Sequence, residues 1–188
     1  GVSQFEVNGA PVSLGLDLNA LKEIQKQSNG NISITIAPAT GLSKEVKALL
    51  GNRPVYNITI SYVDKNGKTQ TITSLGSGTA TLSIPYTPGK NEAVGYLFGV
   101  YVDANGKAQR IDGSAYDANS GSLLIPTGHF SVYGVGYTDP SAQFTDIGTH
   151  WGKESIDYVV GRGLLSGTSK TTFAPDTAMT RGMLVTAL

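Results

Sequence analysis

Alternating apolar and polar positions run through most of the chain up to residue 137. Ile32, Ile34 and Ile36 alternate with hydroxyl side chains, which is the period of a strand with one buried face. The same criteria predict strands over residues 4–7, 12–14, 32–37, 55–63, 68–72, 79–85, 94–102, 107–111, 122–125 and 130–137. Short strands at intervals of about 8–12 residues, separated by turn residues, favour a β-sandwich over a parallel sheet.

Two segments depart from this alternation and predict short helices. Asp17 is a suitable N-cap for a helix in which Leu21 and Ile24 share one face. Ser43 begins a second apolar stripe, which ends at Gly51. We therefore expect a mainly β fold that also contains α-helix, namely a β-sandwich-like domain with two short helices.

Two tetrapeptides of similar sequence, Asp64–Gly67 and Asp103–Gly106, lie between predicted strands. Each contains Asn-Gly, which supplies the positive φ angles that tight turns require, so each is predicted to close a hairpin. The flanking residues also repeat, which leaves a duplicated strand–turn–strand unit open as a second interpretation. The Asp and Asn oxygens are a ligand type that calcium uses, but a calcium loop needs several more of them. Turn chemistry is therefore the preferred interpretation.

The composition changes at residues 138–142, which are polar and interrupted by a proline. We expect one domain over residues 1–138 and a second, mainly helical segment over residues 139–188. In this segment Thr149 is placed to cap a helix running to about residue 162, with Trp151 and Ile156 on its apolar stripe. Phe173 offers a core anchor, and Thr180 is placed to begin another helix.

The order and spacing of five short motifs in residues 143–188 resemble a known family. The motifs are Phe144–Ile147, His150-Trp151, Gly163–Gly167, Phe173–Pro175 and Thr180–Met183. Together they resemble one repeat of the S-layer homology (SLH) family, the bacterial module that holds exported proteins on cell-wall polysaccharide. The resemblance implies an extracellular location at the bacterial cell surface, in the cell wall or S-layer.

The resemblance also implies a partner and a binding site. In this family three repeats pack around a pseudo-threefold axis, and grooves between them bind pyruvylated secondary cell-wall polysaccharide. By carry-over, Arg181 is the first polymer-binding candidate, together with Thr180 of the same motif. A guanidinium suits a ketal carboxylate because two parallel N–H bonds meet two oxygens. Trp151 offers an apolar platform for a sugar face. Core packing is the alternative role for Trp151, and simple solvation that for Arg181.

The motif at Thr180 departs from the family pattern. The family's Thr-Arg-Ala-Glu forms a capping box, but Gly182 and Met183 replace the alanine and glutamate here. Half of the box is lost, and a glycine in the first turn costs up to about 1 kcal/mol. One repeat is present, and it stops at Leu188 within the second predicted helix. We therefore expect a fragment of a longer protein, whose neighbouring SLH repeats complete the fold.

Three motifs of the first domain carry a second resemblance. Arg53–Tyr56, Ser83–Pro88 and His129–Tyr133 resemble the β-rich module that often directly precedes SLH repeats in Firmicutes surface proteins. The likeness covers roughly residues 5–137, and no activity comes with it.

Charge and cysteine content limit the possible partners. Fourteen basic residues balance 14 acidic ones, and the absence of a basic run argues against nucleic acid as a partner. No apolar stretch approaches the roughly 18 residues of a membrane span, so we expect no membrane insertion. The chain has no cysteine, which excludes a disulfide scaffold and argues against structural zinc. We expect no cofactor and no metal.

Catalytic motifs are also missing from the sequence. It contains no nucleophile elbow, P-loop or dinucleotide fingerprint. The carboxylates of Asp17, Glu23, Asp112 and Asp117 are of the type that glycosidases pair across a substrate. Capping and turn roles explain them better, so we predict that the chain is not an enzyme.

The sequence thus favours a non-enzymatic surface segment in which a β-rich spacer precedes an anchoring repeat. The alternative is that residues 1–138 form a carbohydrate- or protein-binding adhesion module; part of a surface glycoside hydrolase ranks below it. A contiguous exposed patch of tyrosines would favour binding, and scattered, buried tyrosines a spacer. The tyrosines concerned are Tyr56, Tyr62, Tyr86, Tyr96, Tyr101 and Tyr116. A lysine–asparagine isopeptide crosslink, which lowers the intact mass by one ammonia, stays open without an identifiable triad.

Overall fold

The structure is a computed structural model that describes residues 4–9, 11–28, 30–90, 92–111, 113–161 and 164–187. Three residues that the sequence analysis used, Asp112, Gly163 and Leu188, lie outside the described residues. Its contacts divide the chain into two compact units, one of residues 1–89 with 97–137 and one of residues 90–96 with 138–188. Each unit is described by itself below.

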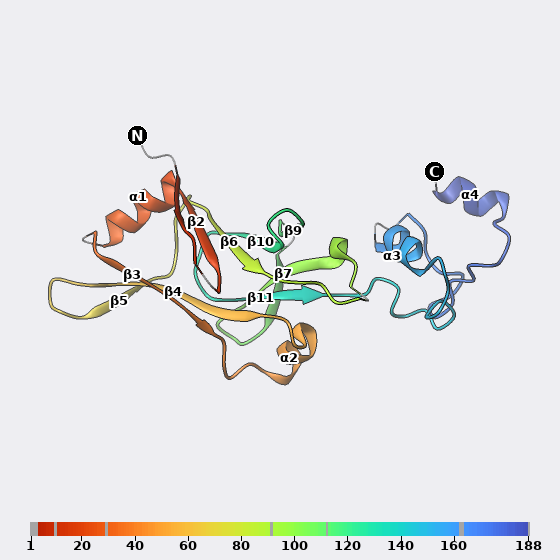
Figure 1. The fold of residues 1–188 in the computed structure, drawn as a ribbon, viewed down its shortest axis with the longest axis horizontal. Helices are drawn as coiled ribbons and strands as arrows, with labels where there is room; N and C mark the ends of the chain where they lie inside the picture. The colour runs from red at the N-terminus through yellow and green to blue at the C-terminus, as the bar shows by residue number, and fades with distance from the viewer. Residues whose placement is uncertain are drawn as a thin grey trace. The chain divides into compact units, whose positions relative to one another are not determined.

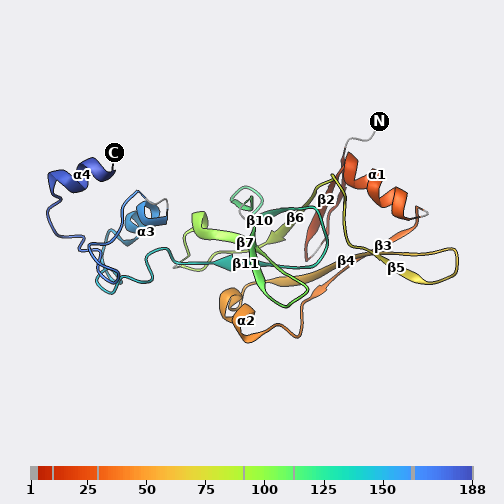
Figure 2. The ribbon, with the colours of Figure 1, turned by 180° about the vertical axis from the view of Figure 1, so that it is seen from behind.

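The first unit contains two antiparallel sheets (Figures 1 and 2). The five-stranded sheet has the order β1-β2-β6-β10-β9. Its strands are β1 (Gln4–Val7), β2 (Ser13–Asp17), β6 (Ala80–Pro85), β9 (Ala115–Asp117) and β10 (Ser122–Thr127). The strand β9 was not predicted, because three residues are too few to display an alternating pattern.

The six-stranded sheet has the order β3-β4-β11-β7-β8, and β5 also pairs with β4. Its strands are β3 (Ile32–Pro38), β4 (Val55–Val63), β5 (Thr69–Ile72), β7 (Leu97–Val102), β8 (Ala108–Ile111) and β11 (Val132–Tyr137). The mainly β, sandwich-like fold class predicted from the sequence is confirmed. One predicted strand is shorter than expected, because residues 94–96 form a 3-10 turn, η1 (Val94–Tyr96), before β7.

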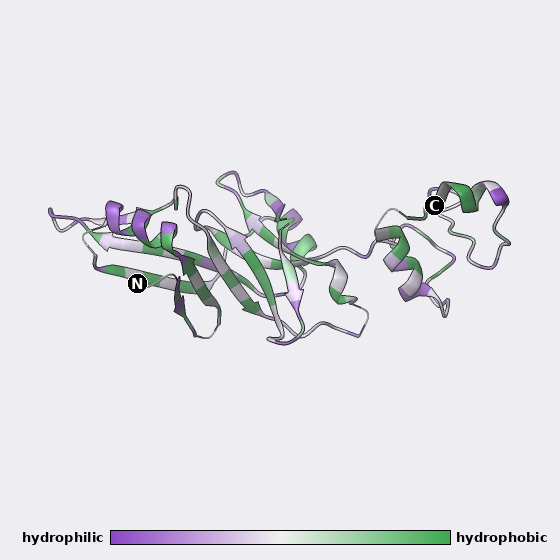
Figure 3. Ribbon diagram, turned by 90° about the horizontal axis from the view of Figure 1, so that it is seen from above, coloured by the Kyte–Doolittle hydropathy of each residue, from purple (hydrophilic) through white to green (hydrophobic). Residues whose placement is uncertain are grey.

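The main core receives apolar side chains from both sheets. Leu14, Leu82 and Leu123 come from the five-stranded sheet and Ile58 and Ile60 from the six-stranded one, and none exposes more than 1% of its surface. This is the alternation that the sequence displays, with one residue in two turned inward. Figure 3 shows the same alternation of hydrophobic and hydrophilic colour along the strands.

Both predicted helices form, and both predicted N-caps are confirmed. In α1 (Leu18–Gln27), the Asp17 carboxylate accepts the Ala20 N–H at 2.7 Å. In α2 (Lys44–Leu50), the Ser43 hydroxyl accepts the Val46 N–H at 3.2 Å. These bonds satisfy N–H groups that the first turn of a helix leaves without a partner.

The two similar tetrapeptides close the hairpins β4–β5 and β7–β8 with the same hydrogen bonds. Asp64 Oδ1 accepts the N–H groups of Asn66 and Lys68 at 2.9 and 3.0 Å. Asp103 Oδ1 likewise accepts the N–H groups of Asn105 and Lys107, at 2.9 Å each. Gly67 has a φ of 76°, which only glycine adopts without strain. The interpretation of both segments as turns is therefore confirmed.

The second unit contains η1, α3 (Lys153–Gly161) and α4 (Arg181–Ala187), joined by irregular segments. Among the described residues its buried core is small and consists of Phe144, Ile147 and Ile156, with Phe173 packed against it as predicted. The predicted start of the first helix at Thr149 is wrong, because α3 begins at Lys153. Consequently Trp151 precedes the helix and does not share its apolar stripe. None of the described helices is long and apolar enough to cross a membrane.

The buried hydroxyl of Tyr133 gives a test of the sandwich core. It donates to the His129 carbonyl at 2.7 Å and lies 2.7 Å from Thr127 Oγ1, and burial raises the pKa of Tyr133 to about 12. We expect Tyr133→Phe to lower the free energy of unfolding by about 1–3 kcal/mol, because it leaves buried polar partners unsatisfied. Urea denaturation measures this. Tyr56→Phe is the control, since Tyr56 is half-buried and its hydroxyl has no hydrogen bond among the described residues.

Candidate functional site

The sequence-predicted polymer-binding residues lie in the second unit, at α4 and in the turn before α3. The Thr180 hydroxyl accepts the Met183 N–H at 3.2 Å. This is the half of the capping box that the sequence retains. Arg181 is the first residue of α4 and is exposed, and within the described part of the chain its guanidinium has no hydrogen bond or ion pair. Its five N–H donors therefore face solvent.

Trp151 is the most exposed large apolar side chain of the described residues, with 91% of its surface accessible. The core-packing alternative for this residue is therefore wrong. Its indole ring lies beside the imidazole of His150, with 5.4 Å between ring centroids and 33° between ring planes. An exposed, supported indole has the form of a platform for a sugar ring.

His150 fixes this turn, a role that the sequence analysis missed. Its Nδ1 accepts the Gly152 N–H at 3.0 Å, which leaves Nε2 to donate to Asp176 Oδ1 at 3.3 Å. The imidazole side chain is only 13% exposed. The His150-Trp151 pair in the sequence was the available signal, but the partner at Asp176 is remote in the chain and no local pattern indicates it.

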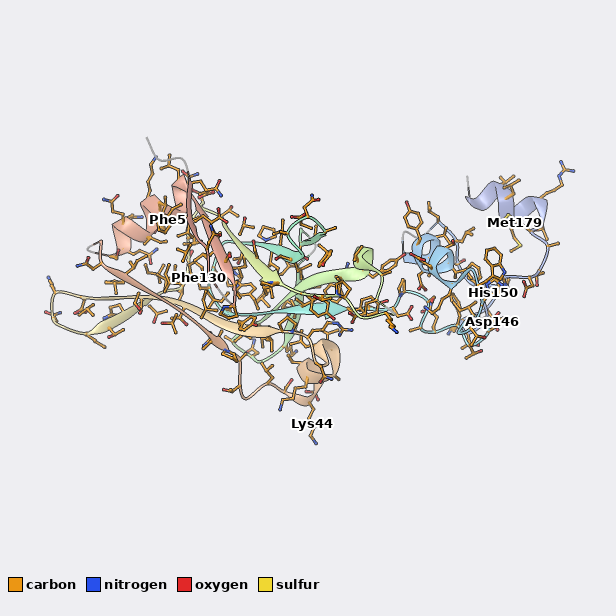
Figure 4. All side chains as sticks on the ribbon, viewed as in Figure 1. Phe5, Lys44, Phe130, Asp146, His150 and Met179 are labelled. Atoms are coloured by element: carbon orange, nitrogen blue, oxygen red, sulfur yellow. The ribbon has the colours of Figure 1, made fainter. Side chains whose placement is uncertain are left out.

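Asp146 holds the segment around Phe173, which is the second missed role. Its two carboxylate oxygens accept the N–H groups of Phe173 and Ala174 at 3.0 and 2.7 Å, and these bonds lower the pKa of Asp146 below its ordinary value of 3.8. Ala174 has a φ of 60°, a conformation that alanine rarely adopts. The Asp146 carboxylate therefore holds an unfavourable backbone in place. Figure 4 labels Asp146 and His150 in the loops next to α3.

A charged cluster attaches the start of the second unit to α3. Lys153 Nζ lies 3.0 Å from Asp139 Oδ2 and 2.8 Å from Asp157 Oδ2, and the Ser141 hydroxyl donates to Asp157. Asp157 and Ser141 are buried. Burial lowers the pKa of Lys153, but its bonds to Asp157 and Asp139 outweigh this and leave the pKa raised. A buried carboxylate with such a cation is stable, whereas an unpaired one is not.

A cavity of about 440 Å³ lies against this cluster within the second unit. Four carboxylates line it, those of Glu92, Asp139, Glu154 and Asp157, against the two ammonium groups of Lys90 and Lys153. The surplus of negative charge, and the engagement of Lys153 with two of the carboxylates, make the cavity unsuitable for an anionic polymer. No group of three or more metal-ligating side chains occurs among the described residues.

A second hollow of about 530 Å³ has the opposite charge balance. Its described lining residues include Gln143, Ser166, Ser169 and Lys170, and none of them is a carboxylate. Phe144 and Leu165 add apolar surface. Hydroxyl, amide and ammonium donors on an apolar floor are compatible with a carbohydrate.

The carboxylates considered for a glycosidase have structural roles where they are described. Asp17 caps α1, Glu23 accepts the side-chain amide of Gln27 at 2.9 Å, and Asp117 accepts the Asn119 N–H at 3.0 Å. For the isopeptide hypothesis, the buried acid of the described chain is Asp157, and its side-chain partners are Ser141 and Lys153. An asparagine is not among them.

The tyrosines form no exposed patch. Each of the six is half-buried. Five of them, Tyr56, Tyr62, Tyr86, Tyr101 and Tyr116, pack against the main core of the first unit. The sixth, Tyr96, belongs to the second unit, where its hydroxyl donates to the Asp157 carbonyl.

In comparison with known families, the model of the S-layer homology domain matches residues 143–182. The resemblance inferred from the five motifs is therefore confirmed, and so is the β-rich region before them. Domains of this family are non-catalytic anchoring modules that bind secondary cell-wall polysaccharide. A domain of this family indicates association with the cell surface or cell wall.

An amylopullulanase from Thermoanaerobacterium thermosulfurigenes is 27% identical over 169 residues. The similarity covers 90% of this chain and 8% of the amylopullulanase, so the chain spans a small part of that relative's length. The aligned stretch is much longer than residues 143–182 and therefore extends into the β-rich unit. No solved structure matches the chain.

The close packing at Gly167 gives a test of how the second unit folds. A Cβ atom there would lie 2.3 Å from the Phe144 ring and 2.6 Å from the carbonyl oxygens of Ser169 and Thr172. We expect Gly167→Ala to destabilise this unit by about 1–3 kcal/mol or more, because backbone atoms must move. Amide NMR signals of residues 144–176 during urea titration measure the loss. Gly148→Ala is the matched control, since its Cβ meets nothing within 4 Å.

The lowered pKa of Asp146 predicts a dependence on pH. A carboxylate whose pKa is lower in the folded state contributes stability that is present above its unfolded pKa and lost as the pH falls through the folded pKa. We expect the urea concentration at the unfolding midpoint of residues 144–176 to decrease as the pH is lowered below about 4. In Asp146→Asn this decrease should be smaller. Asp117→Asn is the control, because Asp117 lies in the first unit. Equal pH dependence in all three proteins would contradict the role of Asp146.

Proposed function

We propose that residues 139–188 are one of three SLH repeats that together anchor a longer protein to pyruvylated secondary cell-wall polysaccharide. In this proposal residues 1–138 form a structural spacer between the anchor and the rest of the protein. The match of residues 143–182 to the family carries the proposal, and the geometry of the second unit supports it in two ways.

The first support is apolar surface that the unit does not cover. In α4, Met183, Leu184 and Val185 are exposed, and Leu164 and Met179 are exposed outside the helix. Much of α4 is coloured hydrophobic in Figure 3. A helix of seven residues is marginal without tertiary contacts. Neighbouring repeats that cover these side chains would supply the missing contacts.

The second support is the chemistry of the exposed site residues. Arg181 presents an unpaired guanidinium, the group best suited to a carboxylate of a pyruvyl ketal. Thr180 fixes the start of the helix that carries it, and Trp151 offers an apolar face for a sugar ring. His150 and Asp146 hold the intervening segments and act as positioning residues.

The adhesion-module alternative for the first unit has less support. A carbohydrate-binding face normally displays exposed aromatic rings, whereas these tyrosines are half-buried and five of them pack on the core. That placement supports a spacer. The relative is named as an enzyme, but this chain corresponds to 8% of it. We therefore assign no catalytic step to these residues and place any activity of the whole protein outside them.

The anchoring proposal is tested by sedimentation with purified cell wall. The test protein is the chain joined to the further SLH repeats that the proposal requires. We expect it to pellet with wall that carries the pyruvylated polymer, and Arg181→Ala to weaken binding about tenfold or more, since a charge-assisted contact is worth roughly 1.5–3 kcal/mol. Arg181→Lys should restore part of the binding, because it keeps the charge but loses the planar fork.

Two controls separate anchoring from general adhesion. Arg110→Ala removes an arginine of the first unit, on β8, and should leave pelleting unchanged. Wall from which the ketal has been removed chemically should bind less than intact wall. If the wild-type protein stays in the supernatant with intact wall, the anchoring proposal is wrong for this chain.

A further inference from the structure

The strand β3 is an unusual edge of the six-stranded sheet. It is paired with β4 over seven residues, Ile32–Pro38, in an uninterrupted register. In the described part of the chain its other side has no strand partner. No residue of β3 is charged. Exposed edges of this kind are templates for pairing with another strand, and proteins usually protect them with charges, bulges or short length.

The remaining edges of the two sheets have such protection. The strand β1 has four residues and contains Glu6, and β9 has three and contains Asp117. Arg110 lies on β8, and β5 is four residues long. Among the described strands β3 is therefore the one edge that is both long and uncharged.

The hydrogen-bond register decides which groups β3 presents outward. The Ala39 N–H donates to the Val55 carbonyl at 3.0 Å, in the register that pairs the rest of β3 with β4. Hydrogen-bonded pairs alternate along an antiparallel ladder. The odd-numbered residues of β3 therefore bond to β4, and the N–H and C=O groups of Ile32, Ile34 and Ile36 point away from the sheet.

The side chains follow the same alternation. Ser33 and Thr35 are exposed on the outer face. The three isoleucines point to the core side but are only half-buried, although they pack against the main core. Core-side residues of the interior strand β4, such as Ile58 and Ile60, are fully buried. The difference arises because no further strand covers the β3 edge.

We propose that β3 pairs antiparallel with β3 of a second copy of this chain, about a twofold axis at Ile34. The sequence is self-complementary in this register, because Ile32 lies opposite Ile36 of the other copy and Ser33 opposite its Thr35. The outward N–H and C=O groups of the three isoleucines then match those of the partner strand. Each isoleucine gains a neighbour on its open side, and two six-stranded sheets join into one.

The proposed pairing extends over only the five residues around the axis, Ile32–Ile36. Pro38 would be the next outward residue, and it has no N–H to donate. Three residues on each strand exchange backbone hydrogen bonds, with no charged group to desolvate. An interface of this size is smaller than that of a permanent dimer, so the association is weak and reversible.

A pair of charge variants tests the interface without altering the core. In Ser33→Lys with Thr35→Lys, each new ammonium group faces another across the axis, and we expect the dimer to dissociate at least tenfold more readily. In Ser33→Glu with Thr35→Lys, opposite charges face each other twice, and dimerisation should be retained or strengthened. Sedimentation equilibrium of the full chain over a wide concentration range measures both, with the wild type as reference.

Cysteine pairing tests the register. The chain has no cysteine, so an introduced thiol has no competitor. Residues 33 and 35 of opposite copies form a non-hydrogen-bonded pair with Cα atoms about 4.5 Å apart, which is within disulfide range. A mixture of Ser33→Cys and Thr35→Cys proteins should form a covalent heterodimer on mild oxidation. Either protein alone should not, because its thiols are diagonal neighbours about 7–8 Å apart.

Three results would overturn the proposal. One is a wild-type chain that remains monomeric at the highest concentration tested. Another is a dimer whose dissociation is equal in both charge variants, which would place the contact elsewhere, for example at the exposed side chains of α4. The third is equal crosslinking of the single-cysteine proteins and their mixture. A loss of the folded state in a variant is detected separately, by its urea denaturation curve.

Discussion

The small core of the second unit is the constraint on which its other features depend. The three apolar side chains buried in its described part, Phe144, Ile147 and Ile156, cannot stabilise a segment of this length alone. Polar contacts supply much of the remaining stabilisation. The ion pairs of Lys153 join the segment at Asp139 to α3, and the Asp146 carboxylate accepts the Phe173 N–H. The same shortage leaves Trp151 and much of α4 exposed, which is what the proposed contacts with neighbouring repeats and polymer require.

The first unit has a much larger apolar core, because its two sheets pack against each other. Alternate residues from both sheets form its main core, against which the half-buried tyrosines pack. A second buried cluster joins α2 to β7. Among its described residues, this unit presents few large apolar side chains to solvent. This packing favours the proposed role as a spacer, and the backbone groups without a strand partner in the described sheets lie at strand edges, above all at β3.

The sequence predicted the features that depend on near neighbours in the chain. Alternation located most strands, and Asp17, Ser43 and the two Asn-Gly turns were assigned from local hydrogen-bond chemistry. Features that depend on remote partners were missed, such as the contacts of His150 with Asp176 and of Asp146 with Ala174. The error at Trp151 has a similar origin. A tryptophan at helical spacing fits a core stripe, and only the late start of α3 places it in solvent.

Wall anchoring by the second unit and pairing of β3 edges, the two proposals made above, support each other when many copies lie on one surface. A weak edge such as β3 has little effect on a dilute protein in solution, because association must offset the lost freedom of both partners. Anchoring many copies to one wall confines them to a thin layer and raises their effective concentration. Pairing through Ile32–Ile36 would then link neighbouring spacers without requiring a large interface. An uncharged, seven-residue edge exposes a freely diffusing protein to unwanted strand pairing. If both proposals hold, the same edge would serve as a lateral contact between anchored copies.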